Sequence, residues 1–187
     1  WVDFAGFKWR IIRINGDGSI RIIYNGTDYS QTGEGTQIGT KAFNSSNNDN
    51  MYVGFRYTSG EVHGIGTPST ILGADNSTDV TTLNGWYNAN IKGTQYEQYI
   101  AQNAGFCNDR TPSTSNSSSN GSGGTGTTTT YYGAYIRLIP GGSWASTQKV
   151  TMKCNESDLF TATTSNKGNK SLANPIGLVT VDEVVYA

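Results

Sequence analysis

The stretch that decides the fold is Lys8-Trp-Arg-Ile-Ile-Arg-Ile-Asn-Gly-Asp-Gly-Ser-Ile-Arg-Ile-Ile-Tyr-Asn25. Two runs rich in isoleucine and arginine flank Asn15-Gly-Asp-Gly18, whose residues tolerate the positive φ angles that a tight turn demands. The pattern predicts a β-hairpin. Because isoleucines fall on both faces of the runs, we expect the hairpin to lie centrally in a sheet.

The turn of this hairpin also resembles a calcium loop, since Asn15, Asp17 and Ser19 carry oxygen atoms at alternate positions. An EF-hand needs a fixed spacing and a downstream bidentate glutamate, and neither is present. A hairpin turn accounts for all three residues. We therefore predict no metal site here and no cofactor for the chain.

A second informative stretch is Asn174-Pro-Ile-Gly-Leu-Val-Thr-Val-Asp-Glu-Val-Val-Tyr-Ala187. Ile176, Leu178 and Val179 predict a short buried strand. Thr180 is placed to cap a helix, with Glu183 three residues on to complete a capping box and acidic charge in the first turn. Such a helix is expected to run two or more further turns, so we expect the segment to mark a boundary inside a larger architecture.

The clearest helical pattern spans Ser77–Lys92, with an apolar stripe at three- and four-residue spacing formed by Val80, Leu83, Tyr87 and Ile91. Asp75 or Ser77 can cap it, and Gly93 suits its end. A second short helix is expected over Thr94–Gln102, with Tyr96, Tyr99 and Ile100 facing inward.

The remaining elements are predicted to be short. Strands are expected within Met51–Tyr57, Tyr131–Ile139 and Lys149–Cys154. Residues 111–130 are almost entirely Ser, Thr, Gly and Asn, which predicts a flexible surface loop because they offer no apolar surface to offset ordering. We expect one α+β domain over residues 1–187, β-rich with two or three short helices.

Composition narrows the function classes. The chain has 187 residues with 35% apolar content, 24 glycines and a formal net charge of −1. Nucleic-acid binding needs a basic face, and none is visible. No apolar run is long enough to cross a bilayer. Low charge with polar uncharged loops favours an exported, extracellular or cell-surface bacterial protein.

The two cysteines, Cys107 and Cys154, lack the CxxC spacing of a zinc knuckle. In an extracellular chain they could form a disulfide, which would contribute about 3–4 kcal/mol by the loop it closes. Two separate buried thiols remain the alternative.

Catalysis has few candidates. His63 is the single histidine, so a Ser-His-Asp or Cys-His site would have to use it, yet no local signature accompanies it. Asp182 and Glu183 are adjacent on a helix start and do not share a face, so capping explains them better than paired acid–base chemistry.

Ligand binding has aromatic candidates. Tyr131, Tyr132 and Trp144 border flexible or glycine-rich segments and are the rings most expected to be exposed, where the C–H face of a sugar could stack. Trp86 and Tyr87 are better explained as the buried side of the first helix.

Five segments spread along the chain carry a family resemblance: Trp9–Arg21, Leu83–Tyr87, Gly105–Arg110, Tyr132–Leu138 and Asn174–Val184. Together they resemble uncharacterised exported domains of gut-associated Gram-positive bacteria, and more distantly the C-type-lectin-like fold of formylglycine-generating enzymes and variable adhesion proteins. The resemblance implies a strand followed by a Thr-x-x-Glu helix start. Such domains continue into a Trp-rich segment and a Gly-x-Arg-Pro-like motif, which this sequence lacks, and the metal-binding cysteine pair of the enzymes has no counterpart in Cys107 and Cys154.

The sequence thus predicts a non-catalytic binding or adhesion module that recognises a glycan or a host or surface protein. Two alternatives stay open. One is a structural surface or pilus-associated subunit that pairs through a strand edge, and the other is a hydrolase or oxidase that uses His63 or the cysteines.

Overall fold

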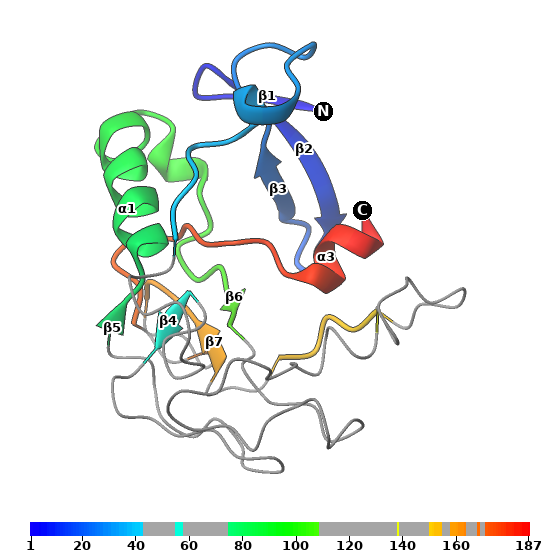
Figure 1. Cartoon of the computed structure of the whole chain (residues 1–187), viewed down its shortest axis with the longest axis vertical. Coiled ribbons are helices and arrows are strands. Elements are labelled where there is room, and N and C mark those ends of the chain that lie inside the picture. The colour runs from blue at the N-terminus through cyan, green and yellow to red at the C-terminus, as the bar shows by residue number, and fades with distance from the viewer. Residues whose placement is uncertain are drawn as a thin grey trace.

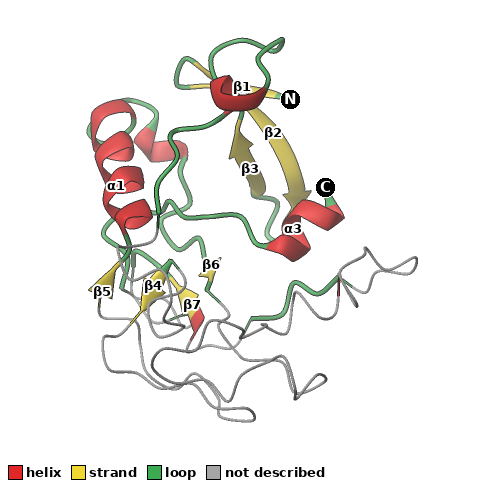
Figure 2. Cartoon of the chain, viewed as in Figure 1, coloured by secondary structure: helices red, strands yellow, loops and turns green. Residues whose placement is uncertain are grey.

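The structure is a computed structural model, and it describes residues 1–42, 55–57, 75–108, 138, 150–154, 158–163, 168 and 171–187. These residues form an α+β arrangement with one three-stranded sheet, two small two-stranded sheets and a few helices (Figures 1 and 2). The α+β prediction is therefore confirmed.

The predicted hairpin forms the main sheet. Strands β2 (Phe7–Ile14) and β3 (Ile20–Tyr24) pair antiparallel, with a register irregularity between Ile11 and Arg13. Strand β1 (Val2–Phe4), which sequence patterning did not identify, pairs with β2 across the two-residue turn Ala5-Gly6, in which both residues have positive φ. A two-residue turn of that kind matches the twist of the strands it joins.

The hairpin is less central than predicted. β2 is the middle strand, but β3 has no further strand partner among the described residues. Most isoleucines of the hairpin are also partly open to solvent: Ile14 of β2 is 73% exposed, and only Ile12 is buried. The prediction failed because isoleucine on both faces was taken to require cover on both faces, whereas single exposed apolar side chains are common.

Helix α1 (Thr78–Asn90) confirms the strongest helical prediction. Ser77 caps it by accepting a hydrogen bond from the backbone N–H of Val80, and Gly93 follows with a φ of 74°. Its stripe is buried and packs into a core whose members come from five separate segments: Phe55, Val80, Leu83, Phe106, Phe160 and Leu172.

Trp86 of α1 joins the helix to the sheet. Its ring packs in tilted and edge-to-face contacts against Phe7, Trp9 and Tyr24, with centroids 5.1 to 6.0 Å apart. Such pairs add to the apolar area they bury. The prediction that Trp86 and Tyr87 serve packing is confirmed.

Two predicted strands are wrong, and one predicted helix is shorter than expected. Thr94–Gln102 contains the 3-10 helix η3 (Glu97–Tyr99), held by bonds between residues three apart. Tyr96 and Ile100 are partly buried as predicted, but Tyr99 is 73% exposed. Residues 150–154 form no strand, and neither do residues 174–179. In the latter, Ile176 packs on the core, Leu178 is partly exposed, and Gly177 lies so close to Phe106 that a Cβ would approach the ring to 2.5 Å.

The two small sheets complete the arrangement. β4 (Arg56–Tyr57), within the predicted Met51–Tyr57 strand, pairs with β5 (Asp75–Asn76), and β6 (Phe106–Cys107) pairs with β7 (Leu159–Phe160). Within the predicted strand Tyr131–Ile139 only Leu138 is described, and it is helical and fully buried. The predicted loop 111–130 lies outside the described residues.

Helix α3 (Val181–Tyr186) confirms the predicted helix start. The side chain of Thr180 accepts from the backbone N–H of Glu183, and the Glu183 carboxylate accepts from the backbone N–H of Thr180. The strand that the resemblance implied before it is not formed. Figure 1 places α3 against the end of β2 remote from the N-terminus.

Candidate functional site

The predicted site residues Tyr131, Tyr132, Trp144 and His63 lie outside the described residues. Cys107 and Cys154 are joined in a disulfide, with Cα atoms 5.9 Å apart, so the predicted pairing is confirmed. While that bond is intact, neither cysteine offers the thiolate that a cysteine nucleophile requires.

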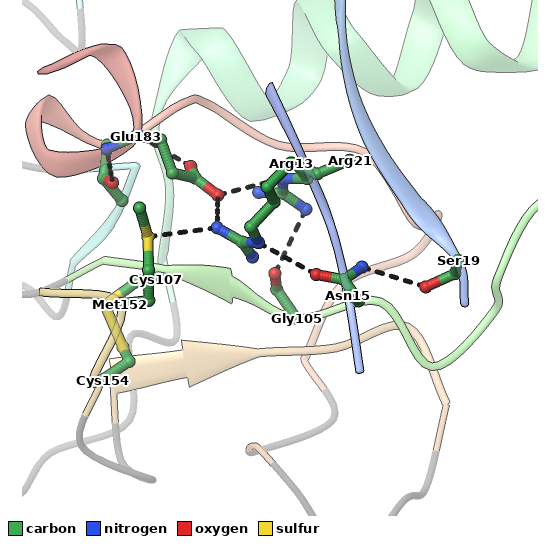
Figure 3. A network of polar contacts seen from close by, with 10 residues as sticks. Arg13, Asn15, Ser19, Arg21, Gly105, Cys107, Met152, Cys154 and Glu183 are labelled. Carbon is green, nitrogen blue, oxygen red and sulfur yellow. Dashed lines mark hydrogen bonds and ion pairs between the residues drawn. A yellow bond between two sulfur atoms is a disulfide. The ribbon is translucent and has the colours of Figure 1, made fainter. Parts of the chain in front are cut away.

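The most connected polar cluster lies between the hairpin and α3 (Figure 3). Arg13 and Arg21 stand directly opposite each other on β2 and β3, where like charges repel. Glu183 pairs with both through one oxygen: its Oε1 accepts a hydrogen bond from Arg13 Nη1 at 2.6 Å and forms an ion pair with Arg21 Nε at 3.2 Å. We call these three residues the Glu183 network.

Further contacts hold each arginine of the network in place. Arg13 Nε donates to Asn15 Oδ1 and its Nη1 to the Met152 sulfur, at 2.9 and 3.3 Å. Arg21 donates to the Gly105 carbonyl oxygen and stacks on the Phe106 ring at 4.1 Å. Burial lowers the pKa of the Arg21 guanidinium, and the Glu183 charge opposes that shift.

The Glu183 network therefore joins α3 to strands β2 and β3. Glu183 is almost wholly buried and serves the helix cap with one oxygen and two arginines with the other. Asp182, also buried, accepts from the backbone N–H of Thr151 at 2.8 Å. Interpreting these acids as capping residues alone was incomplete, because they also tie α3 to the hairpin and to residues 150–154.

The hairpin turn is closed by its own side chains. Asp17 Oδ1 accepts from the backbone N–H and the hydroxyl of Ser19, and Asn15 Nδ2 donates to that hydroxyl. The prediction of a turn is confirmed. Within the described part of the chain, no cluster of three or more His, Cys, Asp or Glu side chains could hold a metal ion.

At the opposite end of the sheet, aromatic and charged side chains meet on the surface. Trp1 and Tyr29 are 55% and 49% exposed, so much of each ring faces solvent, and they contact each other edge to face at 5.2 Å. Lys8 lies over the Tyr29 ring at 4.3 Å and Arg10 over the Trp1 ring at 4.7 Å. We call Trp1, Asp3, Lys8, Arg10, Asp28 and Tyr29 the Trp1–Tyr29 surface.

Asp3 organises one half of this surface. It pairs in register with Lys8 across β1 and β2, and its Oδ1 accepts from Lys8 Nζ at 2.9 Å and from the Tyr29 hydroxyl at 2.6 Å. These two bonds lower the pKa of Asp3, and the same Asp3 carboxylate raises the pKa of Lys8 and of Tyr29. A hydrogen bond from the Ser30 side chain lowers the pKa of Asp28, with help from the Lys8 charge.

The loop that presents Tyr29 is built around Gln31. Its Oε1 accepts from the backbone N–H groups of Thr27 and Asp28, at 2.5 and 3.1 Å. Gly26 makes room for it, with a φ of 84° and a position where a Cβ would lie 1.9 Å from that oxygen. Backbone bonds between Lys8 and residues 25 and 26 then hold the loop beside β2.

This surface offers three kinds of contact to a ligand. Partly open aromatic rings provide apolar faces, and Lys8 and Arg10 provide charged donors. The Oδ2 atoms of Asp3 and Asp28 accept no hydrogen bond within the described part of the chain, so they are free acceptors there. Sequence reasoning missed the surface because β1 was not predicted; the Ala5-Gly6 turn between Phe4 and Phe7 was its only signal.

Comparison of the chain with protein-family models, with curated proteins and with solved structures found no match. No helix among the described residues has the length and apolar character needed to span a membrane.

Proposed function

We propose that this chain is an extracellular binding module that recognises a glycan through the Trp1–Tyr29 surface. The observation that carries the proposal is the pair of half-exposed rings, each held by a cation and by the other ring. Exposed aromatic side chains fixed in this way are preorganised, so a ligand orders few side chains when it binds.

The chemistry of a sugar suits these groups. Its C–H face stacks on aromatic rings, and its hydroxyl groups donate to carboxylate oxygens. Trp1 and Tyr29 supply the rings, and Asp3 and Asp28 supply carboxylate oxygens that are not used by the protein in the described residues. Small sites commonly combine an apolar platform with a few oriented polar groups.

We also propose that the protein is exported from a bacterial cell and that its fold is C-type-lectin-like. The Cys107–Cys154 disulfide supports export, because disulfides persist in oxidising compartments. The capping box at Thr180 and Glu183 matches the helix start that the C-type-lectin-like resemblance implies. The unformed strand over residues 174–179 does not match it.

A glycan array followed by calorimetric titration of the best binder tests the proposal. Trp1→Ala and Tyr29→Ala should each weaken binding about tenfold or more, as central aromatic contacts do. Tyr186→Ala is the matched control, since it removes an exposed tyrosine from α3 at the other end of the sheet. Absence of any bound glycan, or equal affinity in Trp1→Ala and Tyr186→Ala, would refute the proposal.

One observation favours a second candidate, a structural subunit that assembles through protein contacts. Exposed apolar side chains gather on elements that adjoin at the hairpin tip and α3: Ile14, Ile20, Met152, Val181, Val184 and Tyr186. Exposed apolar patches mark interaction surfaces. Light scattering across a concentration series would show assembly that Ile14→Lys abolishes, whereas a monomer at every concentration would contradict self-assembly.

A further inference from the structure

The two cations of the Trp1–Tyr29 surface differ in how far the protein neutralises them. Lys8 donates to Asp3 at 2.9 Å, and its charge also reaches Asp28. Arg10 lies two residues after Lys8 on the same face of β2, beside Trp1, and it has no carboxylate partner in the described part of the chain. The surface therefore has an acidic, internally paired end at Tyr29 and a cationic end at Trp1.

Arg10 is oriented although it is exposed. Its Nε donates to Asn25 Oδ1 at 3.0 Å, and Asn25 is itself buried. The flat guanidinium lies over the Trp1 ring, which leaves it few alternative positions. Its Nη1 and Nη2 groups donate to no acceptor among the residues described, so one side of the guanidinium fork is available to a ligand.

We infer that the glycan bound at the Trp1–Tyr29 surface carries an oxyanion, a carboxylate or a sulfate, that is held by the Nη1 and Nη2 groups of Arg10; this rests on the proposed function. A planar guanidinium matches such an anion with two parallel hydrogen bonds, which a lysine ammonium cannot reproduce. The ring of Trp1 lies against the same guanidinium, so a sugar stacked there brings its charged substituent beside Arg10. The free oxygens of Asp3 and Asp28 repel an anion at the Tyr29 end, and this fixes the direction in which the ligand lies.

The test is an array on which each acidic oligosaccharide stands beside its neutralised form. Oligogalacturonates paired with their methyl esters probe the carboxylate, and sulfated galactan oligosaccharides paired with their desulfated forms probe the sulfate. We expect binding to the acidic members of at least one pair, with about tenfold or greater preference over the neutral members. Raising the salt concentration should reduce the preference, because Arg10 is exposed to solvent.

Variants of Arg10 separate anion recognition from support of Trp1. Arg10→Gln should remove the preference for the acidic member and lower the affinity for the neutral member by a smaller factor, because Arg10 also holds the Trp1 ring. Arg10→Lys should retain only part of the preference. Lys41 is an exposed cation next to Ala42, which contacts Thr78 at the start of α1 and not the Trp1–Tyr29 surface. Lys41→Gln should therefore change neither the preference nor the neutral-member affinity.

The outcomes distinguish the inference from the proposed function. Equal binding of acidic and neutral members, with loss in Trp1→Ala, overturns the inference and leaves glycan binding standing. An equal fold-loss of affinity for both members in Arg10→Gln, or the same loss of preference in Lys41→Gln, also overturns it, because Arg10 would then only support the ring or contribute general charge. Binding of no glycan at all overturns both.

Discussion

The two ends of the three-stranded sheet carry the same kinds of charged residue, but these residues have different roles at each end. At the α3 end, Arg13, Arg21 and Glu183 meet under cover, with 24%, 12% and 4% of their side chains exposed. At the Trp1–Tyr29 end, the Asp3 side chain is 60% exposed and Arg10 is also exposed, whereas Lys8, at 22%, is covered about as much as Arg13. The two ends therefore differ most in the burial of the carboxylate that pairs with the cations.

Burial determines what each cluster contributes. A buried charge costs several kcal/mol if left unpaired, so the α3 end is committed to its internal partners and holds the tertiary structure. Exposed ion pairs contribute little to stability, so the Trp1–Tyr29 end can exchange its partners for a ligand at small cost. We therefore expect mutations at the first end to affect folding and mutations at the second to affect binding.

Breaking the disulfide should have the largest effect, and at the α3 end. The Cys107→Ala and Cys154→Ala double variant opens a loop of 47 residues, which corresponds to about 4 kcal/mol of unfolding free energy. Released residues 150–154 would loosen Arg13 and Asp182, which contact Met152 and Thr151. Chemical denaturation measures the loss. Amide hydrogen exchange should become faster in α3 and not in β1. Faster exchange in β1 than in α3 would contradict the distinct roles of the two ends of the sheet.

Glu183→Gln should have the next largest effect. It leaves the nearly buried Arg21 opposite Arg13 with no carboxylate between them, and we expect a loss of about 3 kcal/mol. Glu34→Gln, which neutralises an exposed glutamate in η1 (Gly33–Thr36), is the control and should leave the unfolding free energy unchanged. Equal unfolding free energies of the two variants would show that the Glu183 network does not stabilise the tertiary structure.

Gly26→Ala should damage the Trp1–Tyr29 end by a smaller amount. A Cβ there would lie 2.4 Å from the Gly35 carbonyl oxygen and displace Gln31, so we expect a loss of about 2 kcal/mol and weaker glycan binding. Gly18→Ala is the matched control, because its φ is 83° but nothing lies within 4 Å of its Cβ. Gly18→Ala should lower the unfolding free energy by about 1 kcal/mol, because alanine disfavours a positive φ, and it should leave glycan binding unchanged. Comparable binding by the two variants would argue against the role of this loop.

Acid should produce the smallest change. The pKa of Asp3 is lower in the folded chain than in the unfolded chain, so its contribution is complete above the unfolded value and is lost as pH falls through the folded value. At a pH below that folded value, which is itself below the ordinary aspartate pKa of about 3.9, the Tyr29 hydroxyl should lose its charged acceptor, seen as a shift of the Tyr29 NMR resonances without global unfolding. The same transition in Asp3→Asn would assign it to another group.

Local patterns predicted well wherever one short segment supplies its own partners. The turn at Asn15–Ser19, the cap and stripe of α1 and the capping box at Thr180 were all predicted, because every contact involved spans a few residues. The strands predicted for Lys149–Cys154 and Ile176–Val179 are not formed in the described residues, since a strand exists only if another segment lies beside it. Strand β1 was missed because its three residues show no strand pattern alone and become a strand only by pairing with β2.

Local sequence patterns were enough to predict the hairpin, α1, the start of α3 and two cysteines that could pair. Three-dimensional packing set which arginines Glu183 joins, which end of the sheet is covered and which rings stay open. Hydrogen bonds within a turn or cap depend on residue identity a few positions away. Burial, and with it the energetic role of a charge or an aromatic ring, depends on segments that are distant in the sequence.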